Sequence, residues 1–238
     1  MSGQGPDRML RYRPQTALER LLDRLSRLPG YPGQVARRKL SRRYAPRAVA
    51  DFEARLAAVG PGDVLVDLGA NVGEFTERLA KTGATVHAWE PDPFAFQNLS
   101  RRCADWPNVI LHNAAVGARA GRLRLGRSAD FNKDPLVHTT SSSIYFNGST
   151  AEGIEVDVVS FADAMARCGG RPKIVKMDIE GAEFGILEEI FRAPAAQNFD
   201  ALYVETHERL DPSKIPLIDR LRAEAEAIPH PVINLYWP

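Results

Sequence analysis

The feature that most constrains this chain is a short apolar run followed at once by two closely spaced glycines. Residues 64–67 have the composition of a buried parallel strand, which ends in an acid, Asp67. Gly69 and Gly73 then bracket a tight turn, and apolar residues resume at helical spacing. Glycine lets a backbone approach a ligand closely, and a helix N-terminus presents unpaired N–H groups. The sequence therefore predicts a cradle for a nucleotide-like ligand.

A second acid supports this interpretation. Residues 84–90 predict another strand, and it ends at Glu90, which lies 23 positions after Asp67. This spacing is close to the roughly 20 positions expected of an acid that binds ribose hydroxyls. The alternative is an ordinary surface glutamate at a strand end. Asp92 lies in the next turn, which we place on the adenine side of the ligand.

The type of nucleotide follows from what the turn lacks. A dinucleotide site needs glycines at the first, third and sixth positions, whereas Asn71 and Glu74 occupy the third and sixth here. A carboxylate at position 74 would repel a pyrophosphate. No Gly-Lys-Ser/Thr follows, which excludes a P-loop. The turn suits a cationic ligand without phosphate, such as S-adenosylmethionine, held by Asp67, Gly69, Asn71, Gly73 and Glu90.

Two later strands also end in polar residues. Residues 173–178 predict a buried strand ending in Asp178, with Glu180 in the turn that follows. Residues 201–205 predict another, ending in Glu205 and followed by His207. In a doubly wound sheet the carboxyl ends of the strands meet at one edge, where ligands bind. We therefore expect a Rossmann-like, mostly parallel α/β fold with these side chains along one crevice.

The 238 residues are enough for one domain with an extension. The chain has no apolar run of transmembrane length and does not open on a signal peptide. Its two cysteines, Cys103 and Cys168, lack metal-ligand spacing, which is typical of the reduced thiols of a cytoplasmic protein. We expect the cofactor-binding domain to span residues 61–238.

Residues 1–60 form the predicted extension, which is helical and basic. The first 50 residues hold twelve Lys and Arg against three acids, a net charge of +9. A capping box at Thr16 and Glu19 starts one helix with a row of leucines, and a second helix is expected over 48–59. The plain interpretation is a helical cap whose arginines are solvated or meet the acidic body. An anionic lipid surface, a phosphorylated substrate or nucleic acid are the alternatives.

Between Glu90 and Asp178 the pattern of apolar and polar residues predicts secondary structure less clearly. Residues 109–116 predict a third strand, residues 122–125 a short fourth, and residues 154–158 alternate as an edge strand does. Residues 127–153 form a long polar segment, and we interpret it as a lid that brings Ser142 or Ser143 near the bound ligand; a disordered or passive linker is the alternative.

The combination of motifs resembles the FkbM family of S-adenosylmethionine-dependent methyltransferases. The resemblance spans residues 62–210, and its most specific element is the Lys-Met-Asp-Ile-Glu-Gly-Ala-Glu run that begins at Lys176. It implies methyl transfer to a hydroxyl of a sugar, cyclitol or other natural product. Asn113 and Ala114, from a further shared motif, are implied on the cofactor side, and Glu180 on the substrate side. The basic extension lies outside the resemblance, and the chain end has room for one final strand where the fold usually has two.

A hydroxyl nucleophile needs a base of near-neutral pKa, and His207 is the candidate by type and position, with Asp178 and Glu205 beside it. Asp178 could instead take the proton itself, or bind the amino group of the cofactor. A histidine that is only structural is the alternative. We expect chemistry without a metal ion; a divalent ion held by Asp178, Glu205 and His207 is the competing hypothesis. Lys176 is expected to be the counter-ion of a buried acid.

Other classes of function fit less well. A short-chain dehydrogenase is excluded because neither Tyr145 nor Tyr203 has a lysine four positions later. An RNA methyltransferase is favoured only by the basic extension. A non-catalytic cofactor-binding module would leave the convergence of Asp178, Glu180 and His207 without a reason. The acceptor, and whether the chain forms oligomers, are not encoded in any motif.

Overall fold

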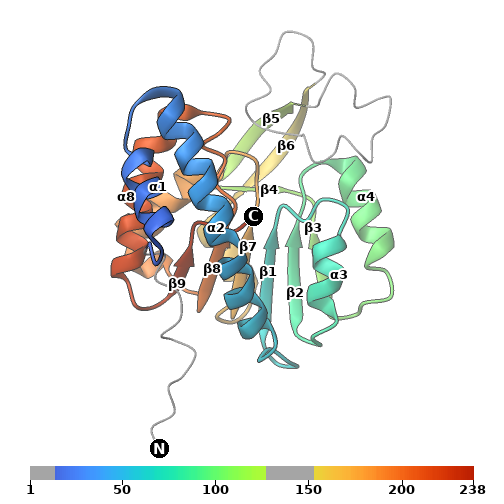
Figure 1. Ribbon diagram of the computed structural model, residues 1–238. Helices are drawn as coiled ribbons and strands as arrows, with labels where there is room; N and C mark the ends of the chain where they lie inside the picture. Colours follow the sequence, from blue (N-terminus) through green and yellow to red (C-terminus); the bar gives the residue numbers. More distant parts are fainter. Residues whose placement is uncertain (1–13, 127–152) are drawn as a thin grey trace, which may run out of the picture.

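The computed structural model describes residues 14–126 and 153–238, and a six-stranded sheet forms its centre (Figure 1). The strands are, in spatial order, β3 (Val109–His112), β2 (Thr85–Trp89), β1 (Val64–Leu68), β7 (Ile174–Met177), β8 (Ala201–Val204) and β9 (Val232–Asn234). All pairings in this sheet are parallel. The strand order reverses between β1 and β7, which opens a crevice at their carboxyl ends. The doubly wound, Rossmann-like prediction is confirmed.

Helices cover both faces of the sheet. They are α1 (Ala17–Ser26), α2 (Gly30–Leu56), α3 (Glu74–Ala80), α4 (Pro93–Arg102), α6 (Phe161–Arg167), α7 (Glu183–Arg192) and α8 (Ile215–Ala227), with short 3-10 turns η3 (Pro194–Ala196) and η4 (Pro212–Lys214). Val66, Val175 and Leu202 face α6, α7 and α8. Leu65 and Val86, which alternate to the opposite face, pack with α2 and α3. Almost all residues of the inner strands β1, β2, β7 and β8 are buried because both faces are covered, whereas Ile110 of the edge strand β3 is 43% exposed.

A second, smaller sheet stands above the carboxyl ends of the main strands (Figure 1). It contains β4 (Ala115–Gly117), β6 (Gly153–Ser160) and β5 (Gly121–Gly126), with β6 in the middle. Two expectations from the sequence are therefore wrong in detail. Residues 109–116 are two strands of different sheets, and β6 is a central strand that pairs on both sides. Residues 127–152, with Ser142 and Ser143, lie outside the described residues.

The basic extension packs partly on itself, where α1 and the first half of α2 share a small core, and partly on the main sheet. The helix expected over 48–59 is the last part of α2, which begins at Gly30 and ends at Leu56. Pro46 lies inside this helix at an exposed position and does not end it. Phe52 of α2 belongs to the core of the main sheet, and the ring centroids of Phe52 and Trp237 lie 4.6 Å apart. The buried Tyr203 hydroxyl donates a 2.6 Å hydrogen bond to Asp51. The second half of α2 thus contacts the domain expected over residues 61–238.

The first helix has the predicted capping box between Thr16 and Glu19. Of its expected apolar face only Leu22 is buried, against α2. The other leucines of the row, between 37% and 52% exposed, are Leu18, Leu21, Leu25 and Leu28. Some arginines of the region meet acids, as the plain interpretation predicts: Arg47 pairs with Glu19 at 2.6 Å, and Arg37 pairs with Asp219 of α8.

The end of the chain adds one strand to the sheet. β9 pairs in parallel with β8, so within residues 153–238 no second strand completes the hairpin that the fold usually has. The residues after β9 return to the extension, where the rings of Tyr236 and Tyr44 meet edge to face at 4.9 Å. Among the described helices, none has the length and apolar composition needed to cross a membrane.

Candidate active site

The turn after β1 lies extremely close to the end of β7. A Cβ atom at Gly69 would come within 1.8 Å of the carbonyl oxygen of Asp178, and Gly69 has a φ of +80°. Only glycine fits this position without moving one of the two strand ends. Lys176 reinforces the approach, because its Nζ donates to the Gly69 carbonyl at 3.0 Å. The two acidic motifs of the sequence are thereby joined at the crevice.

Asp67 does not line the ligand cavity, although the sequence analysis placed it among the cofactor residues. Its side chain is fully buried beneath α3, where Thr76 donates to it at 2.7 Å and Lys176 pairs with it at 3.2 Å. Burial acts to lower the pKa of Lys176, but the charges of Asp67 and Asp178 outweigh it and raise that pKa. Lys176 thus has the counter-ion geometry expected of it, and Asp67 acts on the turn through Lys176.

Glu90 lies at the carboxyl end of β2, where the cradle prediction puts it. One carboxylate oxygen accepts from the backbone N–H of Asn71 at 2.8 Å, and the other from that of Asp92 at 2.8 Å. Burial raises the pKa of Glu90 to about 7, although these two N–H groups act to lower it. The carboxylate ties the turn after β1 to the turn after β2.

Six of the predicted residues line one cavity at the carboxyl ends of β1, β2 and β7: Gly69, Asn71, Glu90, Ala114, Asp178 and Glu180. Its other walls are largely apolar, and two of them, Leu123 and Leu125, come from β5 of the small sheet. The sequence analysis missed these leucines because a short strand carries no sign of the sheet it will join. The cavity therefore combines polar strand ends with an apolar roof.

Three other predicted cofactor residues support the turns around this cavity. Asp92 caps α4 through the backbone N–H of Phe94. The side chain of Asn113 is exposed and donates to the carbonyl of Glu90 at 2.8 Å. Gly73 has a φ of +86° and lies against Leu99 of α4. None of the three is among the residues that line the cavity.

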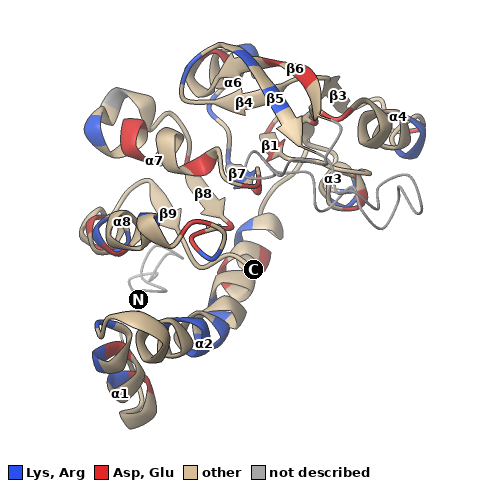
Figure 2. Ribbon diagram, turned by 90° about the horizontal axis from the view of Figure 1, so that it is seen from above, with Lys and Arg blue, Asp and Glu red and all other residues tan. Residues whose placement is uncertain are grey.

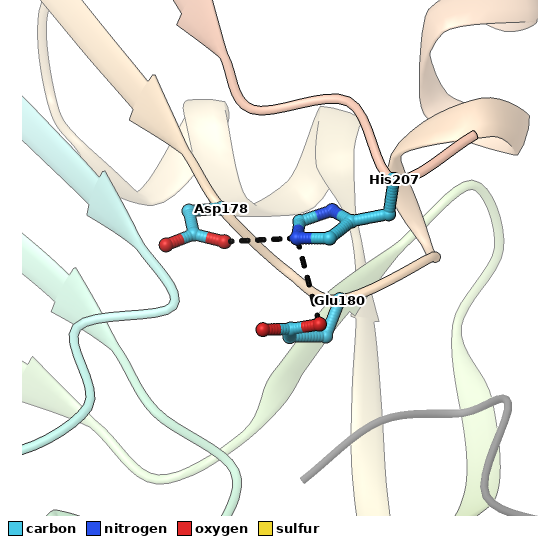
Figure 3. Close-up of side chains that lie close together, drawn as sticks. All are labelled: Asp178, Glu180 and His207. Atoms are coloured by element: carbon cyan, nitrogen blue, oxygen red, sulfur yellow. Dashed lines mark ion pairs between the residues drawn. The ribbon is translucent and has the colours of Figure 1, made fainter. Parts of the chain in front are cut away.

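His207 and three acids form the polar end of the site. His207 follows β8, and its ring points toward Asp178 and Glu180, which follow β7 (Figure 3). The Nε2 atom lies 3.4 Å from a Glu180 oxygen, 3.6 Å from one of Asp178 and 3.7 Å from one of Glu205. Glu180 reaches this position from a left-handed backbone conformation, with a φ of +50°. The convergence predicted from the strand ends is present in the geometry.

Glu183 holds the opposite side of the imidazole, and the sequence analysis gave it no role. Its Oε1 lies 3.1 Å from Nδ1 of His207 and accepts from the backbone N–H of His207 at 2.9 Å. Its Oε2 accepts from the backbone N–H of Gly181 at 2.7 Å. Glu183 is completely buried at the start of α7. In the sequence it is the last residue of the motif that begins at Lys176, which indicated its importance but not its role.

The pKa values of this cluster bear on the expected base. Burial acts to lower the pKa of His207, but the hydrogen bond to Glu183 and the charges of Glu183, Glu180 and Glu205 raise it to about 9. Burial raises the pKa of Glu180 to about 7 and also raises that of Glu205. At neutral pH the imidazole therefore carries two protons. In that state it cannot accept another, which weighs against the role of base that its residue type indicated.

A groove of about 500 Å³ lies on the far side of Glu205, between α2 and the C-terminal residues. Arg38 and Arg42, which are exposed and one helical turn apart on α2, line it together with Arg209 and Arg222. The basic residues of α2 are visible in blue along this helix in Figure 2. Arg209 pairs with Glu205 and Arg222 with Glu208. The groove thus lies between the basic extension and the acidic cluster, by which we mean His207 with Asp178, Glu180 and Glu205 around it.

Comparison with known proteins identifies relatives of the chain. A family model described as "Methyltransferase FkbM domain" matches residues 67–225. Hexuronic acid methyltransferase AglP from Haloferax volcanii is 28% identical over 155 residues, which are 64% of this chain and 59% of that protein. The 31-O-demethyl-FK506 methyltransferase FkbM from Streptomyces tacrolimicus is 29% identical over 153 residues, 53% of this chain and 59% of that protein. The chain thus spans 59% of the length of each of these two relatives.

A shorter similarity extends to enzymes that act on RNA. Ribosomal RNA small subunit methyltransferase A from Thermotoga maritima is 46% identical over 57 residues, which are 24% of this chain and 20% of that protein. The match to the family model, in contrast, includes the turn after β1 and both strand ends that carry the acidic cluster.

Proposed function

Since the chain belongs to the FkbM methyltransferase family, we propose that it uses S-adenosylmethionine to methylate a hydroxyl group of a sugar, a glycan or another natural product. The named relatives support this acceptor class, because one is a hexuronic acid methyltransferase and the other a 31-O-demethyl-FK506 methyltransferase. The observation that carries the proposal is the single cavity that Glu90 and Asn71 line at one end and Asp178 and Glu180 at the other.

The cavity fits the cofactor on two counts. The Oδ1 atom of Asn71 is buried without a hydrogen-bond partner among the described residues, so it is available to a ligand with an N–H donor. The Glu90 carboxylate is placed to accept from ribose hydroxyls, and Leu123 and Leu125 offer an apolar surface for a planar base. When bound, the sulfonium of the cofactor supplies an electrophilic methyl group.

The acceptor side begins at Glu205, which lines the groove and touches the acidic cluster. In the proposed arrangement the groove orients the acceptor, and a carboxylate of the cluster takes the proton from its hydroxyl. Much of the rate enhancement would come from holding the reactants in line, which is worth roughly 7–11 kcal/mol in favourable cases. Arg38 and Arg42 favour an acceptor with an acidic group, such as a uronic acid or a sugar phosphate.

The test begins with the cofactor. Calorimetry with S-adenosylhomocysteine should show binding, and Glu90→Ala should weaken it by about 1.5–3 kcal/mol, as for the loss of a charged hydrogen bond. Binding of NAD without any binding of S-adenosylhomocysteine would overturn the cofactor assignment.

The acceptor is tested by a screen with methyl-labelled cofactor against neutral sugars, uronic acids, lipid-linked glycans and RNA. We expect label in an acidic sugar. Label in RNA alone would overturn the acceptor class and would favour the basic extension as a nucleic-acid surface.

A further inference from the structure

The acidic cluster has the arrangement of a cation site. One atom each of Asp178, Glu180 and His207 lies within 4.8 Å of the other two. Donor atoms of one metal ion lie at similar separations, because each is about 2.0–2.3 Å from the ion. In Figure 3 the three side chains point toward a common centre, from the loops that follow β7 and β8. The sequence alone favoured Glu205 as the third ligand, but Glu180 lies nearer to the imidazole nitrogen.

The histidine supplies a second, independent sign of a ligand. Its side chain is completely buried, yet its Nε2 makes no hydrogen bond in the described part of the chain. The Asp178 oxygen that faces it is also buried and unpartnered. A buried polar atom without a partner is costly, so native structures usually satisfy it with a ligand, an ion or water. Both unsatisfied atoms point to the same place.

The imidazole of His207 has the kind of hydrogen-bond partner that metal-binding histidines have. Such a histidine almost always donates its other ring N–H to a carboxylate or a carbonyl, which fixes the ring and the tautomer. Glu183 provides this contact at Nδ1, and two backbone N–H groups hold Glu183 in turn. When a metal ion takes the place of the Nε2 proton, Nδ1 stays the donor to Glu183 and the lone pair of Nε2 points at the ion, between Asp178 and Glu180.

The balance of charge leads to the same conclusion. Asp178, Glu180, Glu183 and Glu205 gather around one imidazole, and the nearest lysine, Lys176, is shared between Asp178 and the fully buried Asp67. Like charges so close together repel unless a cation offsets them. A divalent ion would offset the charges of its two carboxylate ligands, Asp178 and Glu180, while Arg209 pairs with Glu205.

We propose that Asp178, Glu180 and His207 bind one divalent cation, and that their mixed oxygen and nitrogen donors suit a transition ion such as Mn²⁺. The role of this ion rests on the proposed function. The acceptor hydroxyl would bind beside it and become more acidic. Its proton would pass to Glu205, and the oxygen lone pair would form the new C–O bond as the C–S bond of the methyl donor breaks, leaving S-adenosylhomocysteine.

Binding of Mn²⁺ alone tests the site without any acceptor. Titration followed by the electron paramagnetic resonance signal of free Mn²⁺ should show one bound ion per chain. Glu180→Gln, at a half-buried position, and Asp178→Asn should each weaken binding by about tenfold or more. Glu188→Gln, an exposed carboxylate on α7 outside the cluster, is the matched control and should bind as the unchanged chain does.

Circular dichroism shows whether each variant is folded. The proposal is overturned if the unchanged chain binds no Mn²⁺, or if folded Asp178→Asn and Glu180→Gln bind it as the control does. Calorimetry with S-adenosylhomocysteine separates the two proposals. If the unchanged chain binds S-adenosylhomocysteine but no Mn²⁺, only the proposed metal site is overturned. If it binds Mn²⁺ but no S-adenosylhomocysteine, the metal site stands and the proposed cofactor is overturned.

Discussion

Nδ1 of His207 lies 3.1 Å from Oε1 of Glu183, and neither side chain has any exposed surface. The same carboxylate also accepts from two backbone N–H groups, so it is fixed before the imidazole meets it. Glu183 therefore determines which way the Nε2 atom of His207 faces. It touches neither cofactor nor acceptor in the proposed arrangement, and we describe it as a positioning residue.

Replacing this carboxylate by an amide tests that role. Glu183→Gln keeps the shape of the side chain but turns one acceptor oxygen into a donor, which cannot accept from the backbone or the imidazole. We expect Mn²⁺ affinity to fall by about 10–100-fold, the usual cost of losing such a partner. The affinity for S-adenosylhomocysteine should stay nearly unchanged. A purely structural role would instead lower the unfolding temperature and leave Mn²⁺ binding by the folded fraction intact.

The raised pKa of Glu90 predicts a pH dependence of cofactor binding. Burial puts this pKa at about 7, and the ionised carboxylate is the stronger acceptor for ribose hydroxyls. Below pH 7 the group is protonated, so the dissociation constant of S-adenosylhomocysteine should fall as pH rises from 6 to 8. The change is at most about tenfold per pH unit, because one proton is released. Calorimetry across this range should show it, and Glu90→Gln should flatten the profile.

Alanine substitutions at two glycines test the close approach of the turn after β1 to the end of β7. Gly69 and Gly30 both have a positive φ, but a Cβ at Gly30 would meet nothing within 4 Å, whereas at Gly69 it would meet the Asp178 carbonyl. Gly30→Ala should lower the free energy of unfolding by about 1 kcal/mol, from backbone strain alone. Gly69→Ala should lower it by more than about 3 kcal/mol, because a backbone clash is added. Equal losses in urea unfolding would contradict the close approach.

The groove beside Glu205 predicts a preference for acidic sugars. We expect glucuronic acid to bind the chain more tightly than glucose does, in the presence of S-adenosylhomocysteine. The double variant Arg38→Ala and Arg42→Ala should weaken the binding of glucuronic acid by about 100-fold or more, since hydrogen bonds to charged groups are worth about 1.5–3 kcal/mol each and each 1.4 kcal/mol is tenfold. Arg24→Ala, on α1 and outside the lining of the groove, is the control. Equal binding of both sugars, measured by nuclear magnetic resonance titration, would contradict the prediction.

Much of the central fold could be predicted because its signals are local. The strand, glycine turn and helix after residue 64, and the acids at strand ends, specify the parallel sheet and its crevice. The start of the long helix in the extension was harder to predict, because a proline usually indicates the first turn of a helix. At Pro46 the helix continues, since the lost hydrogen bond is offset by the packing of Tyr44 and Phe52 on either side. Such packing depends on residues far away in the chain.

The residues of the candidate site also divide into those whose positions could be predicted from the sequence and those whose positions could not. Glu90, Asp178 and His207 were predicted to converge because parallel strands share an edge. Asp67 was misplaced because its sequence position shows the strand end but not which face its side chain takes. The role of Glu183 could not be predicted, because it arises from the left-handed turn at Glu180 and Gly181, which brings α7 back under the imidazole.

The contact of α2 with the end of the chain has a consequence for biosynthesis. Phe52 and Tyr44 belong to a helix made early, and their partners Trp237 and Tyr236 are made much later. During translation α2 can pack first on α1 and then on β1 and α3, but the surface that Trp237 and Tyr236 cover stays open until those residues have left the ribosome. Closure of this layer is therefore a late step in the folding of the nascent chain.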